Sequence, residues 1–223
     1  MLTRPAGVVF DMDGLLLDSE RLARETFELA CERLGLAVDP EAYLRCVGST
    51  EEDTARILTE VLASESAYRE LHRHWNALYH ERIETAPVAL KAGALELLRA
   101  LDGYGIPRAL ATSTRRPRAT LKLERAGVLG YFTCLICGGE TDRGKPYPDP
   151  YLAAVTALGT RPSETWALED SEHGVRSART AGLTVFLVPD LIAPGPALAS
   201  LEPRVVNDLF EVLGELHRCC AAG

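Results

Sequence analysis

Short apolar runs recur along the chain, and each ends in polar residues. We predict strands at five such runs, residues 7–10, 108–111, 133–137, 166–168 and 184–188. All but the last are followed by loop residues and a helical pattern, and two of these helices begin at Arg116-Pro117 and at Asp149-Pro150. This alternation indicates an α/β fold, a parallel sheet with helices on both faces.

Residues 19–84 lack this alternation and show helical patterns alone. We predict helices at about 20–34 and 66–84, and two more that open at Asp39-Pro40 and at Ser49. This block carries 14 acidic and 8 basic residues, so most of the chain's net charge of −8 lies in it. We therefore predict an all-helical domain, residues 19–84, inserted into a core made of residues 1–18 and 85–223.

Composition narrows the classes of function. The chain has 223 residues, of which 47% are hydrophobic, and a net charge of −8, which argues against a nucleic-acid partner. No run approaches the roughly 20 apolar residues of a membrane span. The first apolar run, residues 7–10, is too short for a signal peptide. We expect a cytoplasmic protein with no membrane partner, and the oligomeric state stays open, a monomer included.

Polar side chains follow four of the predicted strands. In chain order the clusters are Asp11-Met12-Asp13-Gly14, Thr112-Ser113, Gly144-Lys145-Pro146 and Glu169-Asp170. The carboxyl ends of parallel strands face one crevice, which is where ligands bind in such sheets. We therefore expect the four clusters to form one site.

The carboxylates of this set favour a metal-assisted reaction at phosphorus. Asp11, Asp13 and Asp170 would repel one another without a cation, and oxygen ligands of this kind are those that Mg2+ prefers. Asp11 follows its strand directly, so its carboxylate can attack phosphorus and form an acyl phosphate. Asp13 follows two residues later, in a turn eased by Gly14, and can protonate the leaving oxygen and then accept a proton from water.

The remaining polar residues fit a phosphate site. Thr112 offers a hydroxyl donor, and we place Ser113 in the same site. Lys145 is informative because the chain has three lysines against 21 arginines, and a compact ammonium group can hold a transferring phosphoryl group. Glu169 touches the metal, directly or through a water, or else orients Lys145. Asp170 is the stronger candidate for direct metal ligation.

These segments resemble the four motifs of the haloacid dehalogenase superfamily, and most closely its beta-phosphoglucomutase-like phosphatases. The motifs are FDMDGLLLDSE at 10–20, LATS at 110–113, GKP at 144–146 and LEDS at 168–171. The resemblance implies a Rossmann-like core, a helical cap after the first strand and magnesium as cofactor. It implies Asp11 as nucleophile, Asp13 as acid/base, phosphate held by Thr112 and Lys145, and metal at Asp170 with Glu169 beside it.

The resemblance does not specify which reaction of the superfamily this chain catalyses. A dehalogenase needs no metal, and a phosphonatase needs a cap lysine, which residues 19–84 lack. A mutase of the beta-phosphoglucomutase type is an alternative, but Glu51 stands where its cap arginine would be and Ala23 where its histidine would be. We predict hydrolysis of a small, sugar phosphate-like phosphomonoester, with the physiological substrate open.

Three alternatives lie outside this reaction class. A phospho-receiver switch also uses Asp, Thr, Lys and magnesium at parallel strand ends, but Asp13 and the helical insert favour turnover. A dinucleotide-binding domain would carry GxGxxG after its first strand, and this chain has Asp-Met-Asp-Gly there. A silent interaction protein on the same fold does not need the complete acid/base set. Arg45, Ser49, Glu51, His72 and Trp75 of the cap can face substrate, and we assign none of them.

Overall fold

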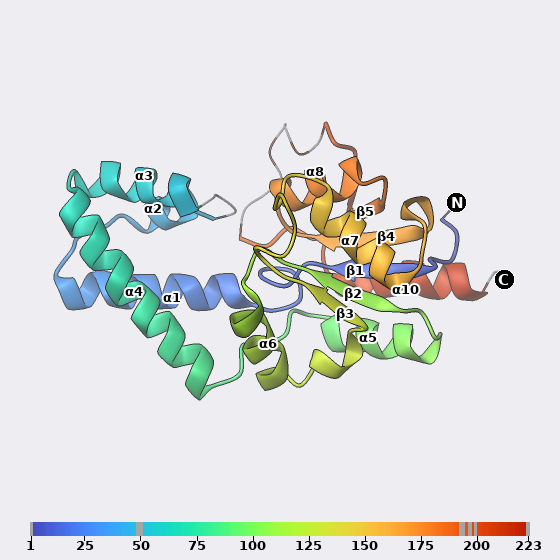
Figure 1. Cartoon of the computed structure of the whole chain (residues 1–223). Helices are drawn as coiled ribbons and strands as arrows, with labels where there is room; N and C mark the ends of the chain where they lie inside the picture. The colour runs from blue at the N-terminus through green and yellow to red at the C-terminus, as the bar shows by residue number, and fades with distance from the viewer. Residues whose placement is uncertain (1, 48–50, 192–194, 196–197, 199, 222–223) are drawn as a thin grey trace. The chain divides into compact units, whose positions relative to one another are not determined.

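The chain forms two compact units, both drawn in Figure 1. The structure is a computed structural model that describes residues 2–47, 51–191, 195, 198 and 200–221. The core unit consists of Met1–Asp18 and Ala89–Gly223, and the helical unit of Ser19–Val88. The sequence predicts the borders at 18/19 and 84/85. The role of the helical unit as a cap over the site stays a prediction.

The core unit contains a parallel sheet in the order β3-β2-β1-β4-β5-β6. Its strands are β1 Gly7–Phe10, β2 Arg108–Ala111, β3 Cys134–Ile136, β4 Thr165–Glu169, β5 Thr184–Leu187 and β6 Arg204–Val205. The predicted α/β fold with a parallel sheet is confirmed. The sequence did not reveal β6, because its two residues are exposed and belong to no apolar run.

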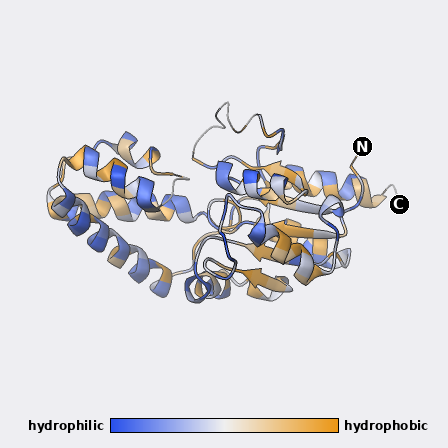
Figure 2. Ribbon diagram, turned by 45° about the horizontal axis from the view of Figure 1, so that its top comes forward, coloured by the Kyte–Doolittle hydropathy of each residue, from blue (hydrophilic) through white to orange (hydrophobic). Residues whose placement is uncertain are grey.

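Helices cover both faces of this sheet, which explains why most of its strands are continuous apolar runs. Figure 1 shows α7 (Asp149–Leu158) and α8 (Glu172–Thr180) on one side, and α5 (Ala94–Gly103) and α6 (Arg116–Arg125) on the other. The closing helix α10 (Leu209–Ala221) packs against α5. The strands are largely hydrophobic in Figure 2. Each of β1, β2 and β4 is buried along its whole length, so the polar residues that follow them are fixed in place.

The helical unit contains α1 (Ser19–Leu34), α2 (Pro40–Leu44), α3 (Glu51–Leu62) and α4 (Glu65–Thr85). Asp39 caps α2 by accepting from the backbone of Glu41, and Ser64 caps α4 by accepting from the backbone of Ala67. The predicted start of the third helix at Ser49 lies outside the described residues. Within the described part of the chain, no helix combines the length and apolar character that crossing a bilayer requires. The cytoplasmic location stays a prediction.

Candidate active site

The site lies where the chain leaves β1, between its neighbours β2 and β4. The backbone N–H of Asp11 donates to the carbonyl of Leu168 over 3.0 Å, which continues the β1–β4 pairing by one residue. The side chains that follow β1 and β4 are therefore brought side by side. The sheet order reverses between these two strands, and ligands of open α/β sheets bind at such a point.

A tight turn after β1 allows the end of β4 to approach. Gly14 has a φ of +83°, and its N–H donates to the carbonyl of Leu17 over 3.0 Å. A Cβ at Gly14 would lie 2.1 Å from Oδ2 of Asp170, so a side chain there would displace this carboxylate. Glycine is thus required by the close approach as well as by the backbone conformation.

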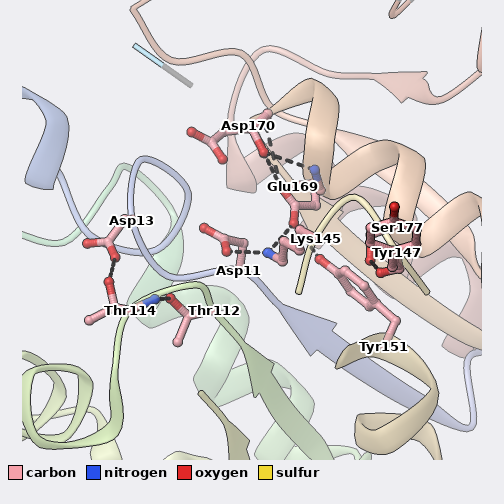
Figure 3. Close-up of polar contacts among 12 residues, drawn as sticks. Asp11, Asp13, Thr112, Thr114, Lys145, Tyr147, Tyr151, Glu169, Asp170 and Ser177 are labelled. Atoms are coloured by element: carbon pink, nitrogen blue, oxygen red, sulfur yellow. Dashed lines mark hydrogen bonds and ion pairs between the residues drawn. The ribbon is translucent and has the colours of Figure 1, made fainter. Parts of the chain in front are cut away.

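Lys145 joins the ends of β1 and β4 (Figure 3). Its ammonium group lies 2.5 Å from Oδ1 of Asp11 and 2.5 Å from Oε1 of Glu169, and 6% of its side chain is exposed. Burial alone would lower the pKa of Lys145, but the two carboxylates raise it above its usual value. Lys145 therefore stays charged at neutral pH and fixes the orientation of the Asp11 carboxylate.

Asp11 is a buried carboxylate with a perturbed pKa. The pKa of Asp11 is raised from 3.8 to about 7, chiefly by burial; Lys145 lowers it, and Glu169 and Asp13 add smaller increases. A carboxylate that is this hard to ionise gains from a nearby cation, because the cation favours its charged form. Perturbed groups of this kind are typical of active sites.

Glu169 is fully buried and engaged on both oxygens. Tyr151 donates to Oε1 over 2.5 Å beside Lys145, and the hydroxyl of Ser171 donates to Oε2 over 3.1 Å. A Cβ at Gly174 would lie 1.9 Å from the carboxylate, so α8 makes room for Glu169 by carrying glycine there. The expectation that Glu169 orients Lys145 matches this geometry. Its ligation of a metal stays a prediction.

Three acidic side chains are close enough to hold one cation. Asp11, Glu169 and Asp170 each offer an oxygen, and these oxygens lie within 4.8 Å of one another. An all-oxygen donor set of this size fits a hard divalent cation such as Mg2+ or Ca2+. The carboxylate of Asp13 is not a member of this group, although the sequence predicts it to be a ligand.

Asp13 instead faces β2 and α6. Its Oδ2 accepts from the hydroxyl of Thr114 over 2.7 Å, and its Oδ1 lies 2.6 Å from the ammonium group of Lys122. The side chain of Lys122 is 3% exposed, so the pair is shielded from water on the lysine side. Figure 3 shows the Asp13 carboxylate turned toward Thr114 and away from Asp170. The arrangement separates the predicted acid/base from the acidic group of three.

The predicted phosphate-binding residues follow β2. Thr112 is buried, and its hydroxyl accepts from the backbone N–H of Thr114 over 3.1 Å. Ser113 is exposed, and its carbonyl oxygen would lie 2.0 Å from a Cβ at Gly138. Glycine after β3 therefore lets the two loops touch. The binding of phosphate by Thr112, Ser113 and Lys145 stays a prediction.

Sequence reasoning missed Thr114, Lys122 and Tyr151, which hold Asp13 and Glu169. The rarity of lysine, which singled out Lys145, was a signal that applied equally to Lys122. No comparable signal marked Thr114, because a hydroxyl in a loop is common. Tyr151 lies in an apolar helical pattern, which does not predict a polar role.

The cap candidates have local roles in the helical unit. Trp75 packs against Phe27 and Tyr43, and its indole N–H donates to the carbonyl of Ala23 over 2.9 Å. His72 contacts Asn76 and the ring of Tyr68, and Arg45 lies 3.9 Å from Glu60. Ser49 and the side chain of Glu51 lie outside what the structure describes. Contact of any of these residues with substrate stays unassigned.

Several known proteins are similar in sequence to this chain. Residues 8–188 match the model of the haloacid dehalogenase-like hydrolase family. A phosphorylated carbohydrates phosphatase of Thermotoga maritima is 31% identical over 92% of this chain and 99% of its own length. A protein of Drosophila melanogaster, named a probable pseudouridine-5'-phosphatase, is 34% identical over 85% of this chain and 84% of its own.

A solved structure shows the same fold. It is that of a predicted phosphoglycolate phosphatase from Haemophilus somnus, which is 18% identical, with a TM-score of 0.80 over 96% of this chain and 99% of its own. The family model covers most of the chain, and the four sequence motifs fall within the matched residues. The chain therefore belongs to the haloacid dehalogenase-like hydrolase family.

Proposed function

We propose that this chain is a magnesium-dependent phosphatase that hydrolyses a small, sugar phosphate-like phosphomonoester through an aspartyl-phosphate on Asp11. The observation that carries the proposal is the placement of Lys145. Its ammonium group lies 2.5 Å from the carboxylates of both Asp11 and Glu169, inside a buried acidic site. Such a group can hold a nucleophile in place and neutralise a phosphoryl group beside it.

The named relatives support the substrate class. One is a phosphatase of phosphorylated carbohydrates, and another is named for pseudouridine 5'-phosphate, which also carries its phosphate on a sugar. The chemistry that they share is hydrolysis of a phosphomonoester on a hydroxyl-rich group. The absence of lysine from residues 19–84 and their acidic balance fit a leaving group without a second phosphate.

In the first half-reaction, a carboxylate oxygen of Asp11 attacks phosphorus and forms an acyl phosphate. The bond from phosphorus to the ester oxygen breaks, and Asp13 donates a proton to that oxygen, which leaves as an alcohol. Lys145 fixes the carboxylate of Asp11 and balances negative charge on the phosphoryl group. Lys122 and Thr114 hold the Asp13 carboxylate from one side, so that its proton is delivered from a fixed position.

In the second half-reaction, Asp13 accepts a proton from a water molecule as that water attacks phosphorus. The acyl phosphate bond breaks, Asp11 returns to its carboxylate form, and inorganic phosphate leaves. Thr112 binds phosphate oxygens through both steps, its hydroxyl donating while it accepts from the backbone N–H of Thr114. Magnesium, when bound by Asp11 and Asp170 with Glu169 beside them, supplies charge that offsets these carboxylates and the phosphate.

A mutase of the beta-phosphoglucomutase type fits less well. Such an enzyme must hold a second phosphate, and this chain has Glu51 and Ala23 at the two cap positions where that group carries Arg and His. Because both cap residues differ, hydrolysis is the better supported reaction.

The test is a phosphatase screen over sugar phosphates, nucleoside monophosphates and phosphoglycolate, with magnesium and with chelator. Asp11→Asn removes the attacking oxygen while preserving shape, and we expect it to abolish turnover and to prevent trapping of a phosphoprotein. Asp102→Asn is the matched control, because Asp102 is an exposed ion-pair partner of Arg108 at the end of α5. Turnover that survives in Asp11→Asn, or that is unaffected by chelator in the wild type, would contradict the proposal.

A further inference from the structure

The third lysine of the chain lies beside the same site. Lys91 is in the segment that follows the helical unit, and its backbone N–H donates to the carbonyl of Leu16 over 3.0 Å, in the loop after β1. Its ammonium group lies 2.5 Å from Oδ1 of Asp190, just after β5. All three lysines of the chain therefore pair with carboxylates at or next to the site.

Only one carboxylate oxygen of Asp190 has a hydrogen-bond partner among the described residues. Its side chain is 7% exposed, and Lys91 occupies Oδ1. Oδ2 is buried and finds no hydrogen-bond partner among the described residues. A buried carboxylate oxygen without a donor is costly, which points to a donor outside the described residues, such as a bound water.

The free oxygen is directed toward the acidic group. The point where a Cβ of Gly14 would lie is 2.1 Å from Oδ2 of Asp170 and 3.3 Å from Oδ2 of Asp190. Both oxygens thus lie against the same side of Gly14, where the missing side chain leaves them room. Asp190 does not belong to the group of three whose oxygens lie within 4.8 Å of one another, so it is farther from their common centre.

Charge counting also places Asp190 with the site. Five carboxylates lie at or next to the site, those of Asp11, Asp13, Glu169, Asp170 and Asp190, and all but that of Asp170 pair with the ammonium group of one of the three lysines. The set carries a formal charge of −2, which one divalent cation balances. Buried charges are stable when they are compensated in this way.

We propose that Asp190 is an outer ligand of the cation site, with Oδ2 accepting a hydrogen bond from a water molecule bound to the divalent cation. This inference rests on the proposed function for the presence of the cation. Asp190 acts as a positioning residue, because it holds the water and not the substrate. Lys91 keeps the Asp190 carboxylate in place and balances its charge, and the absence of a Cβ at Gly14 leaves room for the Asp170 carboxylate beside it.

Manganese binding without substrate tests this role. Free Mn2+ is measured by electron paramagnetic resonance while the metal is added to metal-free wild type, Asp190→Asn and the control Asp102→Asn. The Asn amide can keep its oxygen on Lys91, which puts a donor where the water needs an acceptor. We expect the Kd for Mn2+ to rise about tenfold or more in Asp190→Asn, as for other outer partners of metal ligands, and to change less than about twofold in the control.

The outcomes separate this inference from the proposed function. A wild type that binds no Mn2+ would contradict both. A wild type that binds Mn2+, together with an equal Kd in Asp190→Asn, would overturn the role of Asp190 alone. Thermal unfolding without metal checks that each variant is folded. If Asp190→Asn does not fold, Lys91→Gln combined with Asp190→Asn removes the pair without leaving a buried charge, and the same rise in Kd is expected.

Discussion

The core unit has buried ion pairs between residues far apart in sequence, whereas the described ion pairs of the helical unit are exposed. In the helical unit, arginines pair with acidic residues one turn away, as in Arg24–Glu28 and Arg69–Glu65, and these side chains are 39–74% exposed. In the core unit, the lysines pair with carboxylates far away in sequence, and the side chain of Lys122 is 3% exposed. The first kind of pair lies on the surface of a helix, and the second kind holds side chains of the site in position.

The difference follows from burial. An exposed ion pair is screened by water and contributes little to the free energy of unfolding, so either residue can be substituted at little cost. A buried pair loses its hydration, and removing one partner leaves an uncompensated charge in a medium of low dielectric constant. The predictions below test whether the lysine pairs of the core unit control activity while the arginine pairs of the helical unit do not.

The largest effect is expected for Lys145→Met. Loss of the ammonium group leaves Asp11 and Glu169 facing each other, and it removes a charge that balances the phosphoryl group. We expect kcat/KM to fall about 10³-fold in a phosphatase assay. Arg143→Met is the control, because Arg143 is two residues away and exposed, and pairs with Asp149. A similar loss in both variants would mean that the loop, and not the ammonium group, matters.

Lys122→Met should have the next largest effect. The lysine holds Oδ1 of Asp13, so its loss lets the acid/base carboxylate turn and lowers kcat about 10²-fold, with a smaller change in KM. Arg125→Met changes an exposed cation on the same helix and is expected to keep wild-type kcat. Unchanged kcat in Lys122→Met would show that Asp13 is held by its other contacts.

The pKa of Asp11 predicts a pH dependence of the metal-free protein. Its folded-state value of about 7 exceeds the ordinary 3.8, so folding favours the protonated form. This contribution to stability is full below pH 4 and is lost as the pH rises through 7. A divalent cation requires the ionised form, so we expect its affinity to fall up to about tenfold per pH unit below 7. Mn2+ titrations between pH 5.5 and 8.5 measure this; an affinity independent of pH would contradict it.

The smallest effect is expected for Arg69→Ala in the helical unit. The pair of Arg69 with Glu65 lies one turn apart on α4, with side chains 74% and 67% exposed. We expect the free energy of unfolding to change by about 0.5 kcal/mol or less, and kcat/KM to stay at the wild-type value. Denaturant unfolding and the phosphatase assay check the two expectations. A large loss of activity would contradict the contrast between the two units.

The sequence determined the order of the elements and the set of candidate side chains. Buried apolar runs become strands of a parallel sheet, and polar residues that directly follow such strands must meet at one edge. Asp11, Thr112, Glu169 and Asp170 could therefore be found from spacing alone. Helix starts such as Asp39-Pro40 were equally accessible, because capping depends on a few neighbouring residues.

Tertiary structure decided which way these side chains face and what holds them. Lys122 lies 109 residues from Asp13, and Lys91 lies 99 residues from Asp190, so no local pattern predicts either pair. The turn at Gly14 places Asp13 toward Thr114 and leaves Asp170 against the glycine, a choice that depends on the packing of β1 between β2 and β4. Spacing along the chain fixes local geometry, whereas the partner of a buried charge is set by what the fold brings within hydrogen-bonding distance.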